Sequence, residues 1–581
     1  MTHSKSQSGS GCPESGHEIS SQTTSILMRQ HLLRRLIAVT FLSTLVGAAA
    51  GASAQTAAWV KQMGTGGISN GVSSDANGNA YATGIVSNPG LFEDVVIPCN
   101  AADVFLTKYD PAGKLLWATI GGGALLDQAN DIATDAAGNS YVVGAIQTNS
   151  LHPTAQFGNF TLTGNGDYDW LLVKYDPAGN VLWAKSDGST AGDTAFGVGL
   201  DPSGNVYLTG FFSGTMTVEG VTVTSSGLFD IFLAKYSPDG ALLWLKRAGG
   251  TGSDIAHGLA IDSIGNVAIV GEFQNTANFG GHSVRAAGLG DAFIAKYDSA
   301  GNNIWVHSGG SATSFVGDPA KAVAVDALNN FYVAGDYTGT ATFDGLSVAN
   351  TGTSGADIFV AKYSNNGAIQ WLHHAGGPLS DKGYAIGVDH AGNSWVSGFA
   401  ASGPGVVFDT IALPPIGNEY IFLAKYDPSG VVQYVKQYAA GTGQDIHVLN
   451  NGSLYLNGGA SKSNNGNEFD DISLLYVDRG GFICKFSDMV TTGCEPPAGL
   501  VASKITSNSA RISWDPMAGA LSYSLQYRKL GSTRWKTKAA STTSVRLTKL
   551  SPNTSYEYQV ATVCADETSP YSDIQVFTTL P

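Results

Sequence analysis

Short runs of alternating apolar and polar residues recur along most of this chain, separated by tight turns. One kind of run follows a D-x-x-G-N turn, as in DANGNAYATG at residues 75–84 and DPSGNVYLTG at 201–210. A second kind ends in a lysine and an aromatic residue, as in DIFLAKY at 230–236. Alternation after a Gly-Asn step is typical of a β-hairpin, and the array lacks the apolar spacing of a long helix. The pattern therefore predicts an all-β chain.

The lysine phrase occurs seven times, at intervals of 60 to 66 residues. Its lysines are Lys108, Lys174, Lys235, Lys296, Lys362, Lys425 and Lys485. A tryptophan strand follows most of them, and its tryptophans are Trp117, Trp183, Trp244, Trp305 and Trp371, with Tyr434 in the sixth place. Trp59 begins such a strand with no lysine strand before it, whereas Lys485 has no tryptophan strand after it. This offset predicts a seven-bladed β-propeller closed by its N-terminal strand, because closure removes the open edges of a linear array.

A residue that is needed in every repeat is usually a building residue rather than a catalytic one. We therefore interpret the seven lysines as structural, each paired with a nearby aspartate of its repeat, and the tryptophans as packing residues. A mostly basic set stands two residues past the tryptophan position. For this set we favour protection of an exposed edge strand over binding of an acidic polymer. Its members are Lys61, Thr119, Lys185, Lys246, His307, His373 and Lys436.

The loop after the Gly-Gly step carries an aspartate in five repeats, eight residues before the aspartate of the next turn. These loops should lead to the innermost strands, so their carboxylates could ring one mouth of a central channel and hold a metal or a cationic or hydroxyl-rich ligand. The alternative is that each aspartate caps its own turn. The five candidates are Asp127, Asp193, Asp254, Asp318 and Asp381.

Charge divides the chain into two parts. Of 581 residues only 13% are charged, and the net charge is -15, which argues against nucleic acid as a partner. Residues 494–581 nevertheless carry 9 basic and 6 acidic residues, so the acidic excess lies in the rest of the chain. Different surfaces favour two domains, at residues 55–490 and 494–581.

The beginning of the chain is predicted to be a targeting segment. Met28 opens a basic stretch, an apolar stretch follows, and small residues at 52–54 suit cleavage before Gln55. We expect residues 28–54 to be a signal peptide and residues 1–27 to be a disordered or non-native extension. An uncleaved membrane anchor is the alternative, but Trp59 would then leave almost no linker between bilayer and repeats.

The repeats resemble those of bacterial secreted seven-bladed β-propeller (SBBP) repeat proteins. The matching residues are D-x-F-x-A-K-Y-D-x-x-G, the W-x-x-x-x-G-G turn and D-x-x-G-N-x-Y-V-x-G, over about residues 55–490. The resemblance implies an exported propeller, often joined to adhesion-type modules, with no established catalytic set. Attachment to the cell surface stays open.

Residues 494–581 resemble a fibronectin type III domain. ARISWDP at 510–516 matches the strand with the core tryptophan, Trp514, and Tyr556 takes the place of the tyrosine-corner residue. Similar bacterial domains pair cysteines placed as Cys494 and Cys564 are, which implies a disulfide between them. Cys99 and Cys484 would lie in neighbouring first and last blades, either as a disulfide or as two buried thiols.

No HExxH or phosphate-loop motif occurs, and we assign no catalytic, cofactor-binding or metal-binding residue. We expect a monomeric, non-enzymatic binding or adhesion protein, secreted, at the cell surface or in the periplasm. Its partner would be an extracellular protein or a glycan, and it would not be an integral membrane protein after cleavage. A carbohydrate-active hydrolase or lyase with carboxylates at the channel mouth is one alternative. A structural component of the cell envelope or matrix is another.

Overall fold

A computed structural model gives the structure of this protein. It describes residues 55–488 and 496–581, apart from 65, 88, 314–316, 353–354, 402–404, 415–418, 450–451, 461–467, 471, 474–479, 498, 516–521, 564–567, 570 and 573. The predicted extension and signal peptide, residues 1–54, lie outside the described residues, as do Cys494 and Cys564. No helix within these described ranges is long and apolar enough to cross a membrane.

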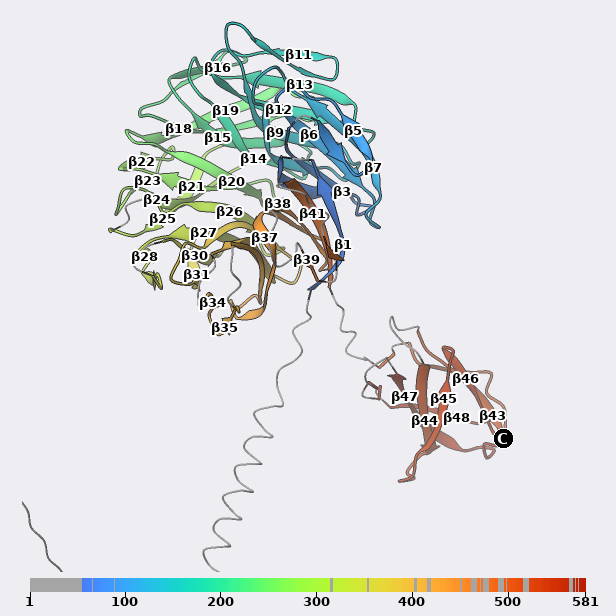
Figure 1. Ribbon diagram of the computed structural model, residues 1–581. Coiled ribbons are helices and arrows are strands. Elements are labelled where there is room, and N and C mark those ends of the chain that lie inside the picture. The colour runs from blue at the N-terminus through green and yellow to red at the C-terminus, as the bar shows by residue number, and fades with distance from the viewer. Residues whose placement is uncertain are drawn as a thin grey trace, which may run out of the picture. The chain divides into compact units, whose positions relative to one another are not determined.

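Each repeat forms four successive antiparallel strands (Figure 1). The first strands are β2 (Ile68–Ser74), β8 (Gln128–Thr134), β14 (Thr194–Leu200), β20 (Ile255–Ile261), β26 (Ala320–Val325), β32 (Lys382–Val388) and the second half of β37 (Val432–Val448). The second strands are β3 (Ala80–Ser87), β9 (Ser140–Gln147), β15 (Val206–Phe212), β21 (Val267–Phe273), β27 (Phe331–Tyr337), β33 (Ser394–Ala400) and β38 (Leu454–Ala460).

The third and fourth strands carry the lysine and tryptophan phrases. The lysine strands are β6 (Ala102–Tyr109), β12 (Tyr168–Tyr175), β18 (Asp230–Tyr236), β24 (Asp291–Tyr297), β30 (Asp357–Tyr363), β36 (Tyr420–Tyr426) and β41 (Gly480–Asp488). The tryptophan-type strands are β7 (Leu115–Gly121), β13 (Val181–Asp187), β19 (Leu242–Gly250), β25 (Asn303–Gly310), β31 (Ile369–Gly376), the first half of β37, and β1 (Gln55–Met63). The second and third strands are almost wholly buried, so the apolar core lies between the sheets of successive repeats.

A short hairpin stands between the second and third strands of each repeat. The hairpins are β4 (Gly90–Phe92) with β5 (Val95–Ile97), β10 (Thr154–Phe157) with β11 (Phe160–Thr163), β16 (Thr215–Val218) with β17 (Val221–Thr224), β22 (Thr276–Asn278) with β23 (Ser283–Arg285), β28 (Thr340–Phe343) with β29 (Leu346–Ala349), β34 (Val407–Phe408) with β35 (Ile411–Ala412), and β39 (Glu468–Phe469) with β40 (Ile472–Ser473). Several of them pair with the fourth strand of the preceding repeat, as β22 does with β19 and β28 with β25. Neighbouring repeats are thus joined by backbone hydrogen bonds as well as by side chains.

The first strands pack on one another in the order of the repeats. They follow the order β2, β8, β14, β20, β26, β32 and β37, and β37 in turn contacts β2. The N-terminal strand β1 pairs with the last lysine strand β41, with Trp59 directly opposite Lys485, as the offset of the two sets predicts. The prediction of an all-β chain is confirmed. No closed sheet occurs in the part of the chain that the structure describes, and the seven-bladed propeller stays a prediction.

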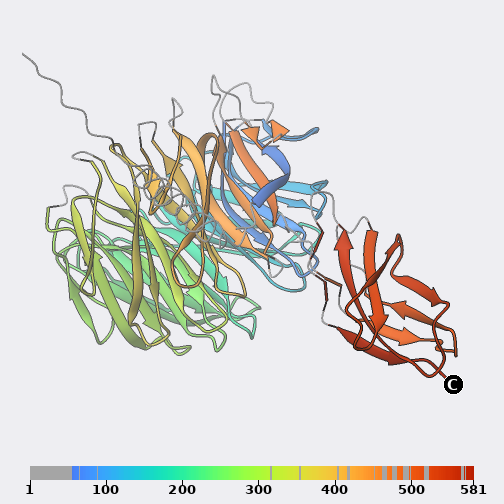
Figure 2. The same cartoon turned by 90° about the horizontal axis from the view of Figure 1, so that it is seen from below.

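The C-terminal residues form a β-sandwich, as predicted. One sheet has the order β42 (Val501–Ser503), β43 (Ser509–Ser513) and β46 (Ser544–Thr548). The other has the order β45 (Lys536–Ala540), β44 (Ser522–Lys529), β47 (Ser555–Val563) and β48 (Gln575–Thr578), and Figure 2 shows the strands in two layers. Trp514 lies in the core between them, and the Tyr556 hydroxyl accepts a hydrogen bond from the Ser551 N–H at 2.9 Å, which is the expected tyrosine corner.

Candidate functional site

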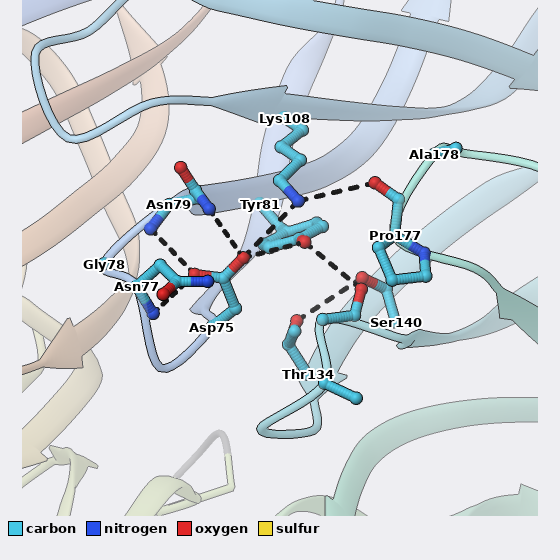
Figure 3. A network of polar contacts seen from close by, with 12 residues as sticks. Asp75, Asn77, Gly78, Asn79, Tyr81, Lys108, Thr134, Ser140, Pro177 and Ala178 are labelled. Carbon is cyan, nitrogen blue, oxygen red and sulfur yellow. Dashed lines mark hydrogen bonds and ion pairs between the residues drawn. The ribbon is translucent and has the colours of Figure 1, made fainter.

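The repeated lysine joins one repeat to the next, as Lys108 illustrates (Figure 3). Its Nζ lies 3.4 Å from Asp75 Oδ2 and donates to the carbonyl oxygen of Pro177 in the following repeat, also at 3.4 Å. The same Nζ lies 4.7 Å from the centre of the Tyr81 ring. Asp75 also accepts a hydrogen bond from the Asn79 N–H at 3.0 Å and so closes its own turn. Lys108 therefore ties a turn of its own repeat to a turn of the next one.

The same contact recurs along the repeats and returns to the first one. Lys235 donates to the carbonyl oxygen of Ser299 at 3.3 Å, and Lys485 in the last repeat donates to that of Pro111 in the first at 3.0 Å. All seven lysine Nζ atoms, those of Lys108, Lys174, Lys235, Lys296, Lys362, Lys425 and Lys485, lie 4.5 to 5.7 Å from an aromatic ring. Ion pairs with a turn aspartate are made by Lys108, Lys235, Lys296 and Lys362. Through these contacts the repeated lysines help to hold the scaffold together.

The tryptophan indole reaches the same carbonyl as the lysine. Trp59 Nε1 donates to Pro111 O at 3.1 Å, and Trp117 Nε1 donates to Pro177 O at 3.2 Å. Trp244, Trp305 and Trp371 make the equivalent bond in their repeats. Trp183 lies in the same position, but its indole N–H is buried with no partner among the described residues.

The basic set beyond the tryptophans is mostly paired with acids. The pairs are Lys61–Glu93 (2.7 Å), Lys185–Glu219 (2.6 Å), His307–Asp344 (2.9 Å), His373–Asp409 (3.1 Å) and Lys436–Asp470. Each acid lies on the hairpin of the next repeat, at a left-handed turn residue that follows its first strand. This set therefore joins repeats, a role beyond the edge protection that the sequence favours.

The five loop aspartates are fully buried, and each holds its loop through backbone N–H groups. Asp127 accepts hydrogen bonds from the N–H of Gly123 at 2.5 Å and from that of Gln147 at 2.9 Å. Asp193, Asp254, Asp318 and Asp381 make the equivalent pairs of bonds. This is the geometry of the turn-capping alternative, and a ligand role for these carboxylates stays a prediction.

A second buried aspartate stands beside the loop aspartate in these repeats. Asp103 Oδ1 and Asp127 Oδ2 lie 2.4 and 2.7 Å from the point that a Cβ on Gly122 would occupy, so only glycine fits between them. Asp103 Oδ1 has no hydrogen-bond partner among the described residues. Burial, with a smaller effect of the nearby Asp103, raises the pKa of Asp127 to about 7 against two backbone hydrogen bonds. The folded protein therefore favours the protonated form of Asp127.

Two positions break the repetition near the ends of the inner strands. One is the bulged residue of each first strand, which is Asn70, Asn130, Phe196, His257, Lys321, Tyr384 or Gln444. The other follows the repeated glycine of each second strand and is Ile85, Ala145, Phe211, Glu272, Asp336, Phe399 or Gly459. Acids occur at this second position only in the fourth and fifth repeats. A binding or catalytic site needs such local differences, because a residue that occurs in every repeat cannot distinguish one repeat from the others.

A cavity of about 760 Å³ lies where these differences gather. Glu272 at the end of β21, Lys321 near the start of β26, Asp336 at the end of β27 and Lys382 at the start of β32 line it. The polar groups of Thr313, Thr338, Asn350 and Ser380 also line it. Its volume is in the range of small-molecule sites. We take it as the candidate functional site.

Opposite charges alternate in this site. Lys321 Nζ lies 3.1 Å from His257 Nε2, which lies 3.4 Å from Glu272 Oε1. Lys382 Nζ lies 4.0 Å from Asp336 Oδ2. The other oxygen, Asp336 Oδ1, is buried with no hydrogen-bond partner in the described ranges, and the residue is only 3% exposed. A buried carboxylate oxygen without a donor is costly unless something supplies one.

Burial and neighbouring charges shift the pKa values of Asp336 and Glu272 in opposite directions. Burial raises the pKa of Asp336 to about 6, against the pull of Lys382 and Lys321. Burial also opposes ionisation of Glu272, but contact with His257 and the nearby lysines brings its pKa below the ordinary value. The pKa of His257 is lowered, first by burial and then by Lys321, so its imidazole is neutral at neutral pH. Glu272 is thus ionised where Asp336 is close to its titration point.

Two of the predicted aspartates, Asp318 and Asp381, lie next in sequence to residues that line this site and are not among its lining residues. Asp318 accepts from the N–H of Thr338, and Asp381 follows Ser380, so both fix residues that face the cavity. Glu272, Lys321, Asp336 and Lys382 are not among the site residues predicted from the sequence. Aligning the repeats could have found them, because IVGEF and VAGDY are the only copies with an acid after the glycine.

Two cysteines lie in the described part of the repeats. Cys99 and Cys484 are buried and unbonded, which is the two-thiol alternative. No group of three or more metal-ligating side chains occurs in the part of the chain that the structure covers.

The comparisons with known proteins cover the two parts of the chain unequally. A Fibronectin type III domain model matches residues 495–577. An uncharacterized WD repeat-containing protein of Acanthamoeba polyphaga mimivirus is 27% identical over 274 residues, 39% of this chain and 19% of that protein. A regulatory protein, FlaEY of Caulobacter vibrioides, is 24% identical over 387 residues, 62% of this chain and 39% of that protein. The chain thus spans less than two fifths of the length of either relative.

Solved structures add a match to single small domains. A structure titled "Myokine structure" is 22% identical, covers 15% of this chain and 98% of its own, and has a TM-score of 0.15. An FN3 domain of human collagen XX is 26% identical, covers 14% of this chain and 91% of its own, and has a TM-score of 0.14.

Proposed function

We propose that this chain is an exported recognition protein whose seven repeats form a seven-bladed β-propeller. The propeller presents the cavity mouth as a binding face for an extracellular protein or glycan. The fibronectin type III domain serves as a spacer or second contact, and the protein acts outside the cytoplasm, secreted or at the cell surface.

The return of the inter-repeat contacts to their starting point supports the propeller. Lys485 donates to Pro111 by the same bond that joins Lys108 to Pro177, and β37 packs on β2 as β2 packs on β8. In a linear array the last repeat would instead leave these groups without a partner. The resemblance to exported SBBP repeat proteins supports export.

One observation carries the recognition role. The repeated residues are engaged in holding the scaffold, whereas Glu272, Lys321, Asp336 and Lys382 occur once each and converge on one cavity. A rigid scaffold with an irregular polar cavity is typical of a binding protein.

The test is a binding screen of purified residues 55–581 against envelope polysaccharides and surface proteins, with calcium and with a chelator. We expect saturable binding of at least one member that heat-denatured protein does not show. Absence of saturable binding to both classes would overturn the recognition role.

A carbohydrate-active hydrolase is the second candidate, and the acidic pair Glu272 and Asp336 favours it. Two carboxyl groups whose pKa values are pushed in opposite directions suit a general acid and a base or nucleophile. Following the chain length of any bound polysaccharide over time separates the candidates. Shortening that Glu272→Gln abolishes would establish the hydrolase, and a constant length would leave binding alone.

A further inference from the structure

We propose that the cavity between the fourth, fifth and sixth repeats binds a sugar unit of an uncharged saccharide, with Asp336 Oδ1 accepting a hydroxyl hydrogen and Lys382 donating to a neighbouring oxygen. The inference rests on the proposed recognition role, because it names the ligand class for the same site.

Asp336 Oδ1 carries the first step. Asp336 lines the cavity, and its Oδ1 atom is buried with no donor among the described residues. Other buried carboxylate oxygens without a donor, such as Asp103 Oδ1, face a second carboxylate across a glycine, where not even a Cβ atom would fit. Asp336 instead faces a cavity that is large enough for a ligand, so a ligand donor can complete it.

The charges around the cavity indicate whether the ligand group that donates to Asp336 is an ammonium or a hydroxyl group. An ammonium group at Asp336 would meet Lys321 and Lys382, which already act on that carboxylate. An anionic group at the lysines would meet Glu272 and Asp336 in turn. Two cations and two acids cancel, so a ligand of either sign gains on one side what it loses on the other. A hydroxyl group can donate to the acids and accept from the lysines without that conflict.

The remaining lining suits the same chemistry. Thr313, Thr338 and Ser380 offer hydroxyl groups and Asn350 offers an amide, all able to donate or accept. Gly317, Gly339, Gly352 and Gly355 leave the walls free of side chains. Such a lining favours a ligand with hydroxyl groups on several sides, as a pyranose has.

The experiment is calorimetric titration of residues 55–581 with glucose, galactose, mannose, N-acetylglucosamine, cellobiose and maltose. Glucuronic acid and glucosamine serve as the anionic and cationic comparators. We expect at least one neutral sugar to bind and its charged counterparts to bind at least about tenfold more weakly. Raising the ionic strength should leave the affinity for the neutral sugar unchanged, because no net charge is paired.

Variants locate the binding. Asp336→Ala should weaken it by at least about tenfold, the loss of a hydrogen bond to a charged group, and Lys382→Met should weaken it severalfold. Gln128→Met changes the matching position of the second repeat, far along the chain from this cavity, and should bind as the unaltered protein does. If thermal melting shows that Asp336→Ala does not fold, Lys382→Met and Gln128→Met still decide the matter.

Three outcomes would overturn the inference: no neutral sugar binds, a charged sugar binds best, or Lys382→Met binds as Gln128→Met does. Each of them leaves the recognition role standing if the same protein binds a surface protein in the broader screen. The recognition role fails only if that screen is empty as well.

Discussion

Trp59 lies opposite Lys485 in the antiparallel pair of β1 and β41, and both side chains donate to the carbonyl oxygen of Pro111, at 3.1 and 3.0 Å. These three residues come from the first strand, the last lysine strand and a turn of the first repeat. Strand β1 thereby holds the last repeat against the first.

Trp59→Ala should lower the free energy of unfolding by about 3–5 kcal/mol, because it removes a 9% exposed indole from a packed site. Trp59→Phe is the control, since it keeps most of the packing and loses one hydrogen bond, about 1 kcal/mol. Urea unfolding of residues 55–581 measures both. Equal, small effects would mean that β1 is not needed to hold the repeats together.

Lys296 and Asp262 form a buried ion pair at 2.9 Å, with side chains 3% and 0% exposed. Lys296→Met should destabilise the protein by about 3–5 kcal/mol, because it leaves the buried Asp262 without its cation. The matched control is Lys61→Met, whose pair with Glu93 is about a third exposed and should be worth at most ~1 kcal/mol. Comparable losses in the two variants would refute a structural role peculiar to the repeated lysines.

Repetition made the scaffold predictable from the sequence. The spacing of the lysine and tryptophan phrases fixed the order of strands in each repeat, and the missing partner of Trp59 pointed to its pairing with the last lysine strand. The partner of Lys61 could not be read in the same way, because Glu93 comes from a hairpin that only the fold brings alongside. The candidate cavity was missed for a related reason. The predicted site residues are ones that the repeats share, whereas Asp336 and Glu272 differ from their counterparts in the other repeats.

The cysteines give a prediction that joins the two parts of the chain. Cys99 and Cys484 are buried thiols whose pKa values burial raises, so neither should react in the folded protein. Cys494 and Cys564 lie outside the described residues, and we propose the disulfide that the fibronectin type III resemblance implies. Residues 55–581 should therefore titrate two thiols when denatured without reductant and four after reduction. Four thiols before reduction would contradict the disulfide, and none would contradict the two free cysteines.

The buried carboxyl pairs predict that stability falls as the pH rises. Burial raises the folded-state pKa to about 7 for Asp127 and to about 6 for Asp193, from an ordinary value of 3.8. A raised pKa means that the folded state binds the proton more tightly than the unfolded state does. This contribution is fully present below pH ~4 and is lost as the pH rises through 6 to 7. The melting temperature should therefore be lower at pH 8 than at pH 5.

Asp103→Asn tests the source of that dependence. It removes one of the two like charges, while the remaining side-chain oxygen can still accept from the Asn100 N–H, which lies 3.0 Å from Asp103 Oδ2. The variant should melt higher than the unaltered protein at pH 8, where both carboxylates would otherwise be charged. It should differ little from the unaltered protein at pH 5, because Asp127 is then mostly protonated and the repulsion is already absent. Asp94→Asn is the control, since it removes a charge from the exposed turn of a hairpin in the same repeat and should leave the pH profile unchanged. Equal gains in the two variants would assign the effect to net charge rather than to the buried pair.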